Sequence, residues 1–126
     1  MAAADVRRYA AQAGSTDTFG RVLCNARTQH FVVDGPAQNG CPGEALSPAE
    51  LFLAGVATCG VELVQVIAKD QNLPVQAVRA TIEAVQDRGQ PVRPDVSLFN
   101  QVRVTFYLQG VTQEQGAALI DSFKRR

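Results

Sequence analysis

The stretch from Ala45 to Asp70, "ALSPAELFLAGVATCGVELVQVIAKD", constrains the fold of this chain more than any other part of the sequence. It opens with a helix-start signal, in which Ser47 is the N-cap, Pro48 suits the first helical position and Glu50 completes a capping box. The helix is predicted to run to about residue 71. Because apolar side chains follow on nearly every side, we expect a long buried helix at the centre of the core.

Cys59 lies in the middle of this predicted helix, with Gly55 before it and Gly60 directly after it. A glycine inside a helix costs about 1 kcal/mol relative to alanine, so both glycines need an explanation. One explanation is the close packing of another part of the chain, and the other is space beside Cys59 for a substrate. Free cysteine is often a small buried hydrophobic residue, which favours packing, but the two explanations are compatible.

Glu62 follows Cys59 by three residues, so the two side chains are neighbours on one helix face. A carboxylate beside a thiol disfavours the thiolate, and the positive end of the helix dipole is too distant to compensate. A reactive Cys59 therefore needs a cation from elsewhere in the chain. The candidates are the arginines of the early strand region, each of which is also explained as an exposed strand charge: Arg7, Arg8, Arg21 and Arg27.

The segments around the helix alternate between apolar and polar residues in the manner of half-buried strands. Turns, not helices, join the neighbouring strands, which favours an α+β fold with antiparallel sheets over a doubly wound sheet. The predicted strands cover residues 5–12, 19–33 with a turn near 25–29, 77–87 and 100–110, and a second helix begins at a capping box formed by Thr112 and Gln115.

Length and charge exclude several classes of protein. The 126 residues suit a single domain over residues 1–126, and 12 basic and 12 acidic side chains give no net charge, which argues against nucleic acid as a partner. The most apolar run, Leu51 to Val61, has 11 residues and falls short of the ~20 that span a bilayer. The start of the chain lacks the apolar core of a signal peptide. We therefore expect a cytoplasmic protein without a membrane partner.

The residues that commonly bind metals are few and scattered. The three cysteines, Cys24, Cys41 and Cys59, form neither a disulfide framework nor a metal-binding spacing. His30 is the only histidine, and its surroundings indicate a half-exposed strand position. There is also no glycine-rich phosphate loop. We expect no metal and no other cofactor.

The helix motif "SPAELFLAGVATCGVELVQVIAKD" resembles the central helix of the OsmC/Ohr family, the osmotically inducible protein C and organic hydroperoxide resistance proteins. The shared features are a Pro-x-Glu-Leu start, a stretch of small residues and an Ala-x-Cys before a second apolar half. The flanking segments "FGRVLCNARTQHFVVDGP" and "LPVQAVRATIEAVQD" resemble the neighbouring strands of the family. The resemblance covers about residues 5 to 125.

This resemblance implies an OsmC-like fold in which two chains intertwine as a homodimer, with the central helices packed at its core. Active family members reduce small hydrophobic organic hydroperoxides. A cysteine thiolate attacks the peroxide bond and becomes a sulfenic acid, a second cysteine resolves it as a disulfide, and an external dithiol such as lipoamide reduces that disulfide. By the resemblance, the attacking cysteine is Cys59, and the activating arginine of the early strand region is Arg21.

The chain departs from the pattern of the peroxidases at three places. Those members carry an acid directly after the helix-opening proline, where this chain has Ala49, with Glu50 one position later. Glu62 indicates a less characterised OsmC-like branch. No second cysteine matches, because Cys41 lies in a loop before the helix, and the chain stops at Arg126 inside a helical pattern. We therefore expect either a frayed end or a sequence that lacks its C-terminal part.

Two functions follow from these observations. The first is a thiol-dependent hydroperoxide peroxidase, in which Cys59 is the nucleophile, Arg21 stabilises its thiolate, and Glu50 and Glu62 are acidic residues of the site. The alternative is a non-catalytic dimer that binds or senses a small ligand, with Cys59 lining an apolar pocket between the subunits. The pH dependence of Cys59 alkylation separates them, because a peroxidase needs the thiolate near neutral pH.

Overall fold

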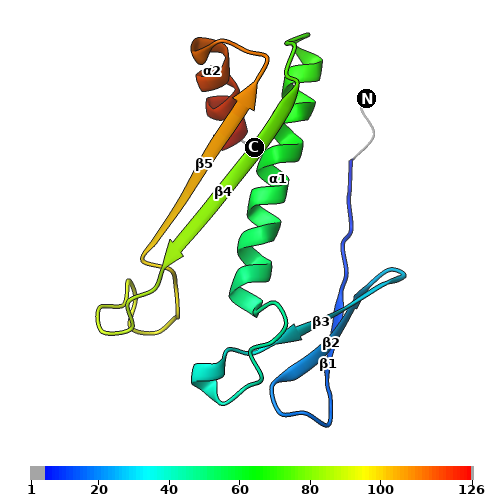
Figure 1. Ribbon diagram of the computed structural model, residues 1–126, viewed down its shortest axis with the longest axis vertical. Helices are drawn as coiled ribbons and strands as arrows, with labels where there is room; N and C mark the ends of the chain where they lie inside the picture. The colour runs from blue at the N-terminus through cyan, green and yellow to red at the C-terminus, as the bar shows by residue number, and fades with distance from the viewer. Residues whose placement is uncertain (1–4, 126) are drawn as a thin grey trace. The chain divides into compact units, whose positions relative to one another are not determined.

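The computed structural model describes residues 5–125 (Figure 1), and the chain divides into two compact units, with the boundary between Leu51 and Phe52. The fold is α+β, with antiparallel sheets and a long central helix, as the sequence predicts. In chain order the elements are β1 (Gln12–Ser15), β2 (Arg21–Ala26), β3 (Gln29–Asp34), a short 3-10 helix η1 (Ala37–Asn39), α1 (Pro48–Asp70), β4 (Ala77–Val85), β5 (Gln101–Gln109) and α2 (Gln113–Lys124).

The first unit contains an antiparallel sheet with the strand order β1-β2-β3. The predicted hairpin over residues 19–33 is confirmed, because β2 and β3 are joined at Arg27, whose φ of 54° makes the tight turn. The strand predicted over 5–12 is wrong, because β1 covers 12–15. Gln12 pairs with Asn25 near the end of β2, so residues before it pass beyond the hairpin turn and have no strand partner there.

The start of α1 confirms the predicted capping box. The backbone N–H of Ser47 donates to Glu50 Oε1 at 3.0 Å, and the N–H of Glu50 donates to Ser47 Oγ at 3.2 Å. The helix spans 23 residues and is therefore longer than the apolar run from Leu51 to Val61, which alone is too short to span a bilayer. By length and composition alone α1 could cross a membrane, a test that core helices of soluble proteins also pass.

The second unit is built on the β4–β5 hairpin. Val78 of β4 and Phe106 of β5 pack against the helices. The next residue on each strand, Arg79 and Tyr107, is exposed, so the predicted alternation is confirmed. The Arg79 guanidinium lies 4.4 Å from the centroid of the Tyr107 ring on that exposed face. The buried centre of the unit comes from α1 and α2, and consists of Val64, Ile67, Ala68 and Leu119.

One face of α1 provides that core, and the opposite face is open in the single chain. Gly60, Val64, Ile67 and Ala68 are buried. We call the open face the Cys59 stripe, and it consists of the exposed residues Phe52, Gly55, Cys59, Glu62 and Val66. Positions three or four residues apart lie on one side of a helix, which is why these five residues form a continuous surface. The helix is thus buried along one side only within its own chain.

The two glycines beside Cys59 have different explanations. A Cβ atom on Gly60 would lie 2.8 Å from Phe106 Cζ and 3.3 Å from Phe123 Cζ, so the two rings require a glycine there. These rings pack edge to face, with centroids 5.4 Å apart. A Cβ atom on Gly55 would meet nothing within 4 Å. Close packing therefore explains Gly60, and Gly55 leaves open space one turn before Cys59.

Replacing Gly60 by Ala is expected to lower the free energy of unfolding by about 1–3 kcal/mol, because the new methyl group must displace the Phe106 ring. The gain in helix propensity, at most about 1 kcal/mol, is too small to offset this. Gly116→Ala in α2 is the matched control, since nothing lies within 4 Å of its Cβ position. Urea denaturation of both variants measures the difference, and equal stabilisation of both would contradict the explanation.

Candidate functional site

Cys59 presents its thiol on the surface of the second unit. The residue is exposed, and in the chain from 5 to 125 its Sγ makes no hydrogen bond. The neighbouring Thr58 hydroxyl instead donates to the Ala54 carbonyl within the helix, at 2.7 Å. The explanation of Cys59 as a small residue that fills the core of its own chain is therefore wrong, because the neighbouring Gly60 occupies the buried side of the helix.

Glu62 lies one turn after Cys59 on the same stripe and is also exposed. Among the described residues its carboxylate forms no ion pair, so no basic side chain neutralises the negative charge of Glu62. The stripe itself thus carries a thiol and a negative charge.

Glu50 is engaged at the start of α1. Its carboxylate accepts the hydrogen bond that closes the capping box with Ser47. The backbone N–H of Ser47, and then its side chain, lower the pKa of Glu50 from its ordinary value. This is a complete structural role, and a part for Glu50 in the chemistry of Cys59 remains a prediction.

Arg21 forms a two-pronged ion pair with Asp34. Arg21 Nε and Nη2 donate to Asp34 Oδ1 and Oδ2, each at 2.9 Å, and Nη2 also approaches Glu44 Oε1 at 3.4 Å. Arg21 and Asp34 are directly opposite in the β2–β3 register, which places the two side chains side by side. The fork of a guanidinium matches a carboxylate in this geometry, and such paired bonds are strong and directional.

Asp34 is the residue of this cluster that the sequence analysis missed. It is fully buried, the one charged side chain that is so among residues 5–125. Besides Arg21, its Oδ2 accepts the backbone N–H groups of Glu44 at 3.1 Å and Ala45 at 2.8 Å. The available signal was an acid at the end of the apolar strand segment "FVVD", directly opposite Arg21 in a predicted hairpin.

The ion pair shifts the pKa values of both partners. The Arg21 guanidinium is the main cause that holds the pKa of Asp34 far below its ordinary value, followed by the N–H of Ala45, and burial opposes them. The hydrogen bonds to Asp34 in turn raise the pKa of Arg21. With Glu44 beside them, one positive charge faces two negative charges. The positive charge of Arg21 is thus balanced by its two acidic partners, while its guanidinium is held in a fixed orientation.

The remaining predicted residues are dispersed. Arg7 forms an ion pair with Asp5 at 3.1 Å, and Arg27 occupies the exposed β2–β3 turn. Within the described residues no group of three His, Cys, Asp or Glu side chains is suited to hold a metal ion. Arg21 belongs to the first unit and Cys59 to the second, so their pairing remains a prediction.

Replacing Asp34 by Asn is expected to flatten the loss of stability in acid. The unfolded-state pKa of an aspartate is about 3.9, and that of Asp34 in the folded chain is lower. Its stabilising contribution is therefore complete above about pH 4 and is lost as the pH falls toward the folded pKa. The free energy of unfolding should be measured by urea from about pH 7 down to about pH 2.

The control for this measurement is Asp95→Asn. Asp95 makes a similar two-pronged pair with Arg93, but both side chains are 59% exposed. This variant should keep the acid slope of the wild type, because exposed pairs contribute little to stability. Parallel pH profiles of the wild type and Asp34→Asn would contradict the expectation.

Solved structures share this fold. An organic hydroperoxide resistance protein, OsmC, from Legionella pneumophila aligns with a TM-score of 0.75 and 21% identity, over 97% of this chain and 85% of that one. An OsmC-like protein from Mycoplasma pneumoniae aligns with a TM-score of 0.81 and 11% identity, over 95% and 82%. The organic hydroperoxide resistance protein OhrB of Bacillus subtilis aligns with a TM-score of 0.60 and 17% identity, over 94% and 84%. At these identities the likeness concerns the fold.

A comparison with curated protein sequences gave no match. At the level of families, residues 41–126 match the family described as OsmC-like protein. The matched region is more than half of the chain and includes α1 with Cys59 and Glu62, whereas Arg21 and Asp34 precede it. On the extent of this match, the chain belongs to the OsmC-like protein family.

Proposed function

We propose that this protein has a redox role in resistance to organic peroxides, and that it acts as a thiol-dependent peroxidase through Cys59. The observation that carries the proposal is the exposed thiol at the centre of the family-matched helix, beside the open space at Gly55. A packing role within its own chain does not account for a cysteine in this place.

The proposed reaction has two stages. The Cys59 thiolate attacks one peroxide oxygen, the O–O bond breaks, an alcohol leaves after it takes up a proton, and Cys59 becomes a sulfenic acid. An external dithiol such as dihydrolipoamide then attacks the sulfenic sulfur, water leaves, and the second thiol of the dithiol displaces Cys59. The dithiol ends as a disulfide, and Cys59 returns as a thiol. Arg21 is proposed to stabilise the thiolate, with Glu50 and Glu62 as acidic residues of the site.

The surface around Cys59 suits a small hydrophobic hydroperoxide. Phe52 is 62% exposed two turns before Cys59, and its ring centroid lies 6.4 Å from that of Phe99. Val66, two turns after Cys59, is also exposed. An apolar substituent on the peroxide would find aromatic and aliphatic surface at both ends of the stripe.

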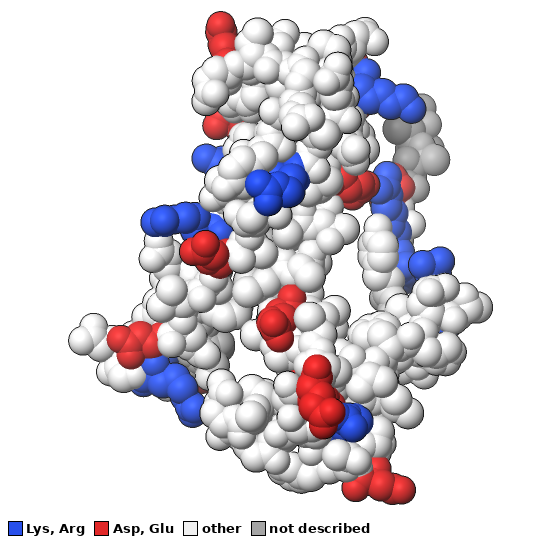
Figure 2. Space-filling model, viewed as in Figure 1, with Lys and Arg blue, Asp and Glu red and all other residues white. Residues whose placement is uncertain are grey.

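A second copy of the chain is the proposed partner that covers the Cys59 stripe. Phe52 and Val66 of this stripe leave apolar area in water beside the charge of Glu62, and a second chain would cover that apolar area. On the face drawn in Figure 2, basic and acidic side chains are interspersed. The lack of a nucleic-acid partner stays a prediction. A cytoplasmic location without membrane contact stays a prediction.

The alternative function is a dimer that binds or senses a small ligand without catalysis. One observation favours it, namely that Asp34 and Glu44 neutralise the charge of Arg21. A cation so neutralised promotes the thiolate less than an unpaired one. Alkylation of Cys59 over a range of pH separates the two functions, because a binder would react only at alkaline pH.

The peroxidase proposal predicts that the wild type consumes an organic hydroperoxide such as cumene hydroperoxide in the presence of dihydrolipoamide, and that Cys59→Ser does not. Serine keeps the size of the side chain but cannot form a sulfenic acid. Cys24→Ser is the matched control and should keep the wild-type rate, because Cys24 is not among the residues proposed to take part in the reaction. Equal rates for the wild type and Cys59→Ser end the proposal.

The dimer proposal predicts that Phe52→Asp shifts the protein from dimer to monomer, because a charge would be buried at the contact. Light scattering coupled to size exclusion over a range of protein concentrations measures the shift. Val92→Asp is the control, since Val92 is similarly exposed at 56% but lies in the loop between β4 and β5. A wild type that is monomeric at all concentrations refutes this partner.

A further inference from the structure

Cys59 and Glu62 are neighbours on one rigid element. Both lie on the Cys59 stripe of α1, inside the second unit, and both are exposed. Residues three positions apart on a helix share one side of it, with about 5–6 Å between their Cβ atoms. A glutamate side chain can therefore bring a carboxylate oxygen to the thiol, directly or through one water molecule. This proximity depends on α1 alone and on no other part of the chain.

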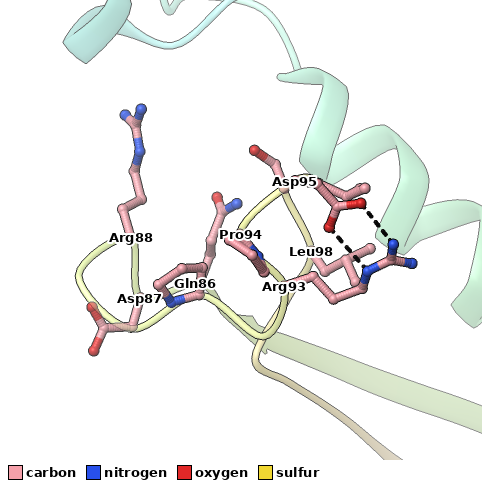
Figure 3. Close-up of a pocket in the computed structure, with 10 residues that line it drawn as sticks. Gln86, Asp87, Arg88, Arg93, Pro94, Asp95 and Leu98 are labelled. Carbon is pink, nitrogen blue, oxygen red and sulfur yellow. Dashed lines mark hydrogen bonds and ion pairs between the residues drawn. The ribbon is translucent and has the colours of Figure 1, made fainter.

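The Glu62 carboxylate is not engaged by any other described group. Within residues 5–125 it accepts no hydrogen bond and forms no ion pair. By contrast, both carboxylate oxygens of Asp95 in the β4–β5 loop are held by Arg93, at 3.1 and 2.7 Å (Figure 3). Both oxygens of Glu62 thus remain open to accept a proton, and to donate it again once they have it.

The elements that pack against α1 add no charge beside Glu62. The charged residues of β4 and β5 take the alternate, exposed positions of the hairpin, on the face away from the helices, and are Arg79, Glu83 and Arg103. Helix α2 packs through Leu119 on the buried side of α1, which is opposite to the stripe. Glu62 is therefore the one charged side chain on the thiol side of the helix among the described residues of α1 between Phe52 and Val66.

A carboxylate beside a reactive thiol is unfavourable if the reaction needs only the thiolate, because its negative charge disfavours that form. The reduction of a hydroperoxide also needs a proton, however, since the alkoxide that leaves is strongly basic. An exposed glutamate is ordinarily a solvated surface charge, which is a sufficient explanation of Glu62 without any function. The two explanations predict different chemistry at Cys59.

We propose that Glu62 is a catalytic residue that carries the thiol proton of Cys59 to the leaving oxygen of the hydroperoxide. This inference rests on the proposed function. The thiol proton passes to a carboxylate oxygen of Glu62, and the sulfur attacks the terminal peroxide oxygen. The S–O bond forms as the O–O bond breaks, and the electron pair of the broken bond stays on the alkoxide oxygen.

That alkoxide oxygen then takes the proton from Glu62. The sulfur is oxidised to the sulfenic acid, the peroxide is reduced to an alcohol, and Glu62 returns as a carboxylate. Glu50 is less suited to this step. It lies nine residues before Cys59, which places it on the other side of the helix, and its carboxylate is held in the capping box with Ser47.

The choice of oxidant decides whether a proton donor is needed. Cumene hydroperoxide releases a strongly basic alkoxide, whereas peracetic acid releases acetate, which leaves without a proton. General acid–base catalysis contributes about 10²–10⁴-fold to a step that needs it. Glu62→Gln keeps the size of the side chain but cannot exchange the proton. It is expected to slow the oxidation of Cys59 by cumene hydroperoxide about a hundredfold, and to leave the oxidation by peracetic acid unchanged or faster.

Each reaction is followed in a single turnover without reductant, in slightly acidic buffer where both oxidants are uncharged. The sulfenic acid is trapped with dimedone and quantified by mass spectrometry of the peptide that contains Cys59. Asp70→Asn is the matched control, because it removes an exposed negative charge from the same helix, about three turns after Cys59. This variant should keep both wild-type rates.

Two results would overturn the inference. One is a Glu62→Gln variant that reacts with cumene hydroperoxide as fast as the wild type or faster, as a pure charge effect predicts. The other is an equal slowing with both oxidants, which indicates altered structure or access. A wild-type Cys59 that reacts with neither oxidant ends the proposed function and this inference together. A wild type that reacts with both keeps the proposed function, whatever Glu62→Gln shows.

Discussion

The structure depends on one constraint, which is that α1 is apolar on more sides than its own chain covers. The β4–β5 hairpin and α2 bury the face that contains Val64 and Ile67, and Gly60 lets the Phe106 and Phe123 rings approach closely. The face that contains Cys59 stays open. Both the proposed chemistry and the proposed partner follow from this open face, because it presents a thiol on an apolar surface.

The sequence predicted helices and strands well where the signal depends only on residues close together in the chain. The capping boxes at Ser47 and Thr112 fixed the starts of both helices, and period-two alternation identified β4 and β5. The first strand was misplaced because its extent depends on where β2 ends, and no residue between 5 and 12 encodes that limit. The burial of α1 was overestimated for a similar reason, since a pattern shows which sides are apolar but not which sides the chain covers.

The sequence suggested candidate residues for the site, but not the contacts that the structure gives them. Cys59 and Arg21 were identified from the family resemblance, and the structure shows the thiol exposed and the arginine paired. Asp34 was missed because its role arises from cross-strand register and from two backbone N–H groups ten and eleven residues later. Such a cluster has no signature in a single sequence, since each of its members has an ordinary local explanation.

The two faces of α1 also differ in how they contribute to stability. The face against Phe106 is covered by the same chain, so its contribution is the same in dilute and concentrated solution. A face covered by a second molecule contributes according to mass action, and its share grows with the logarithm of the protein concentration. One helix would then couple the amount of this protein in the cell to the stability of the surface on which Cys59 lies.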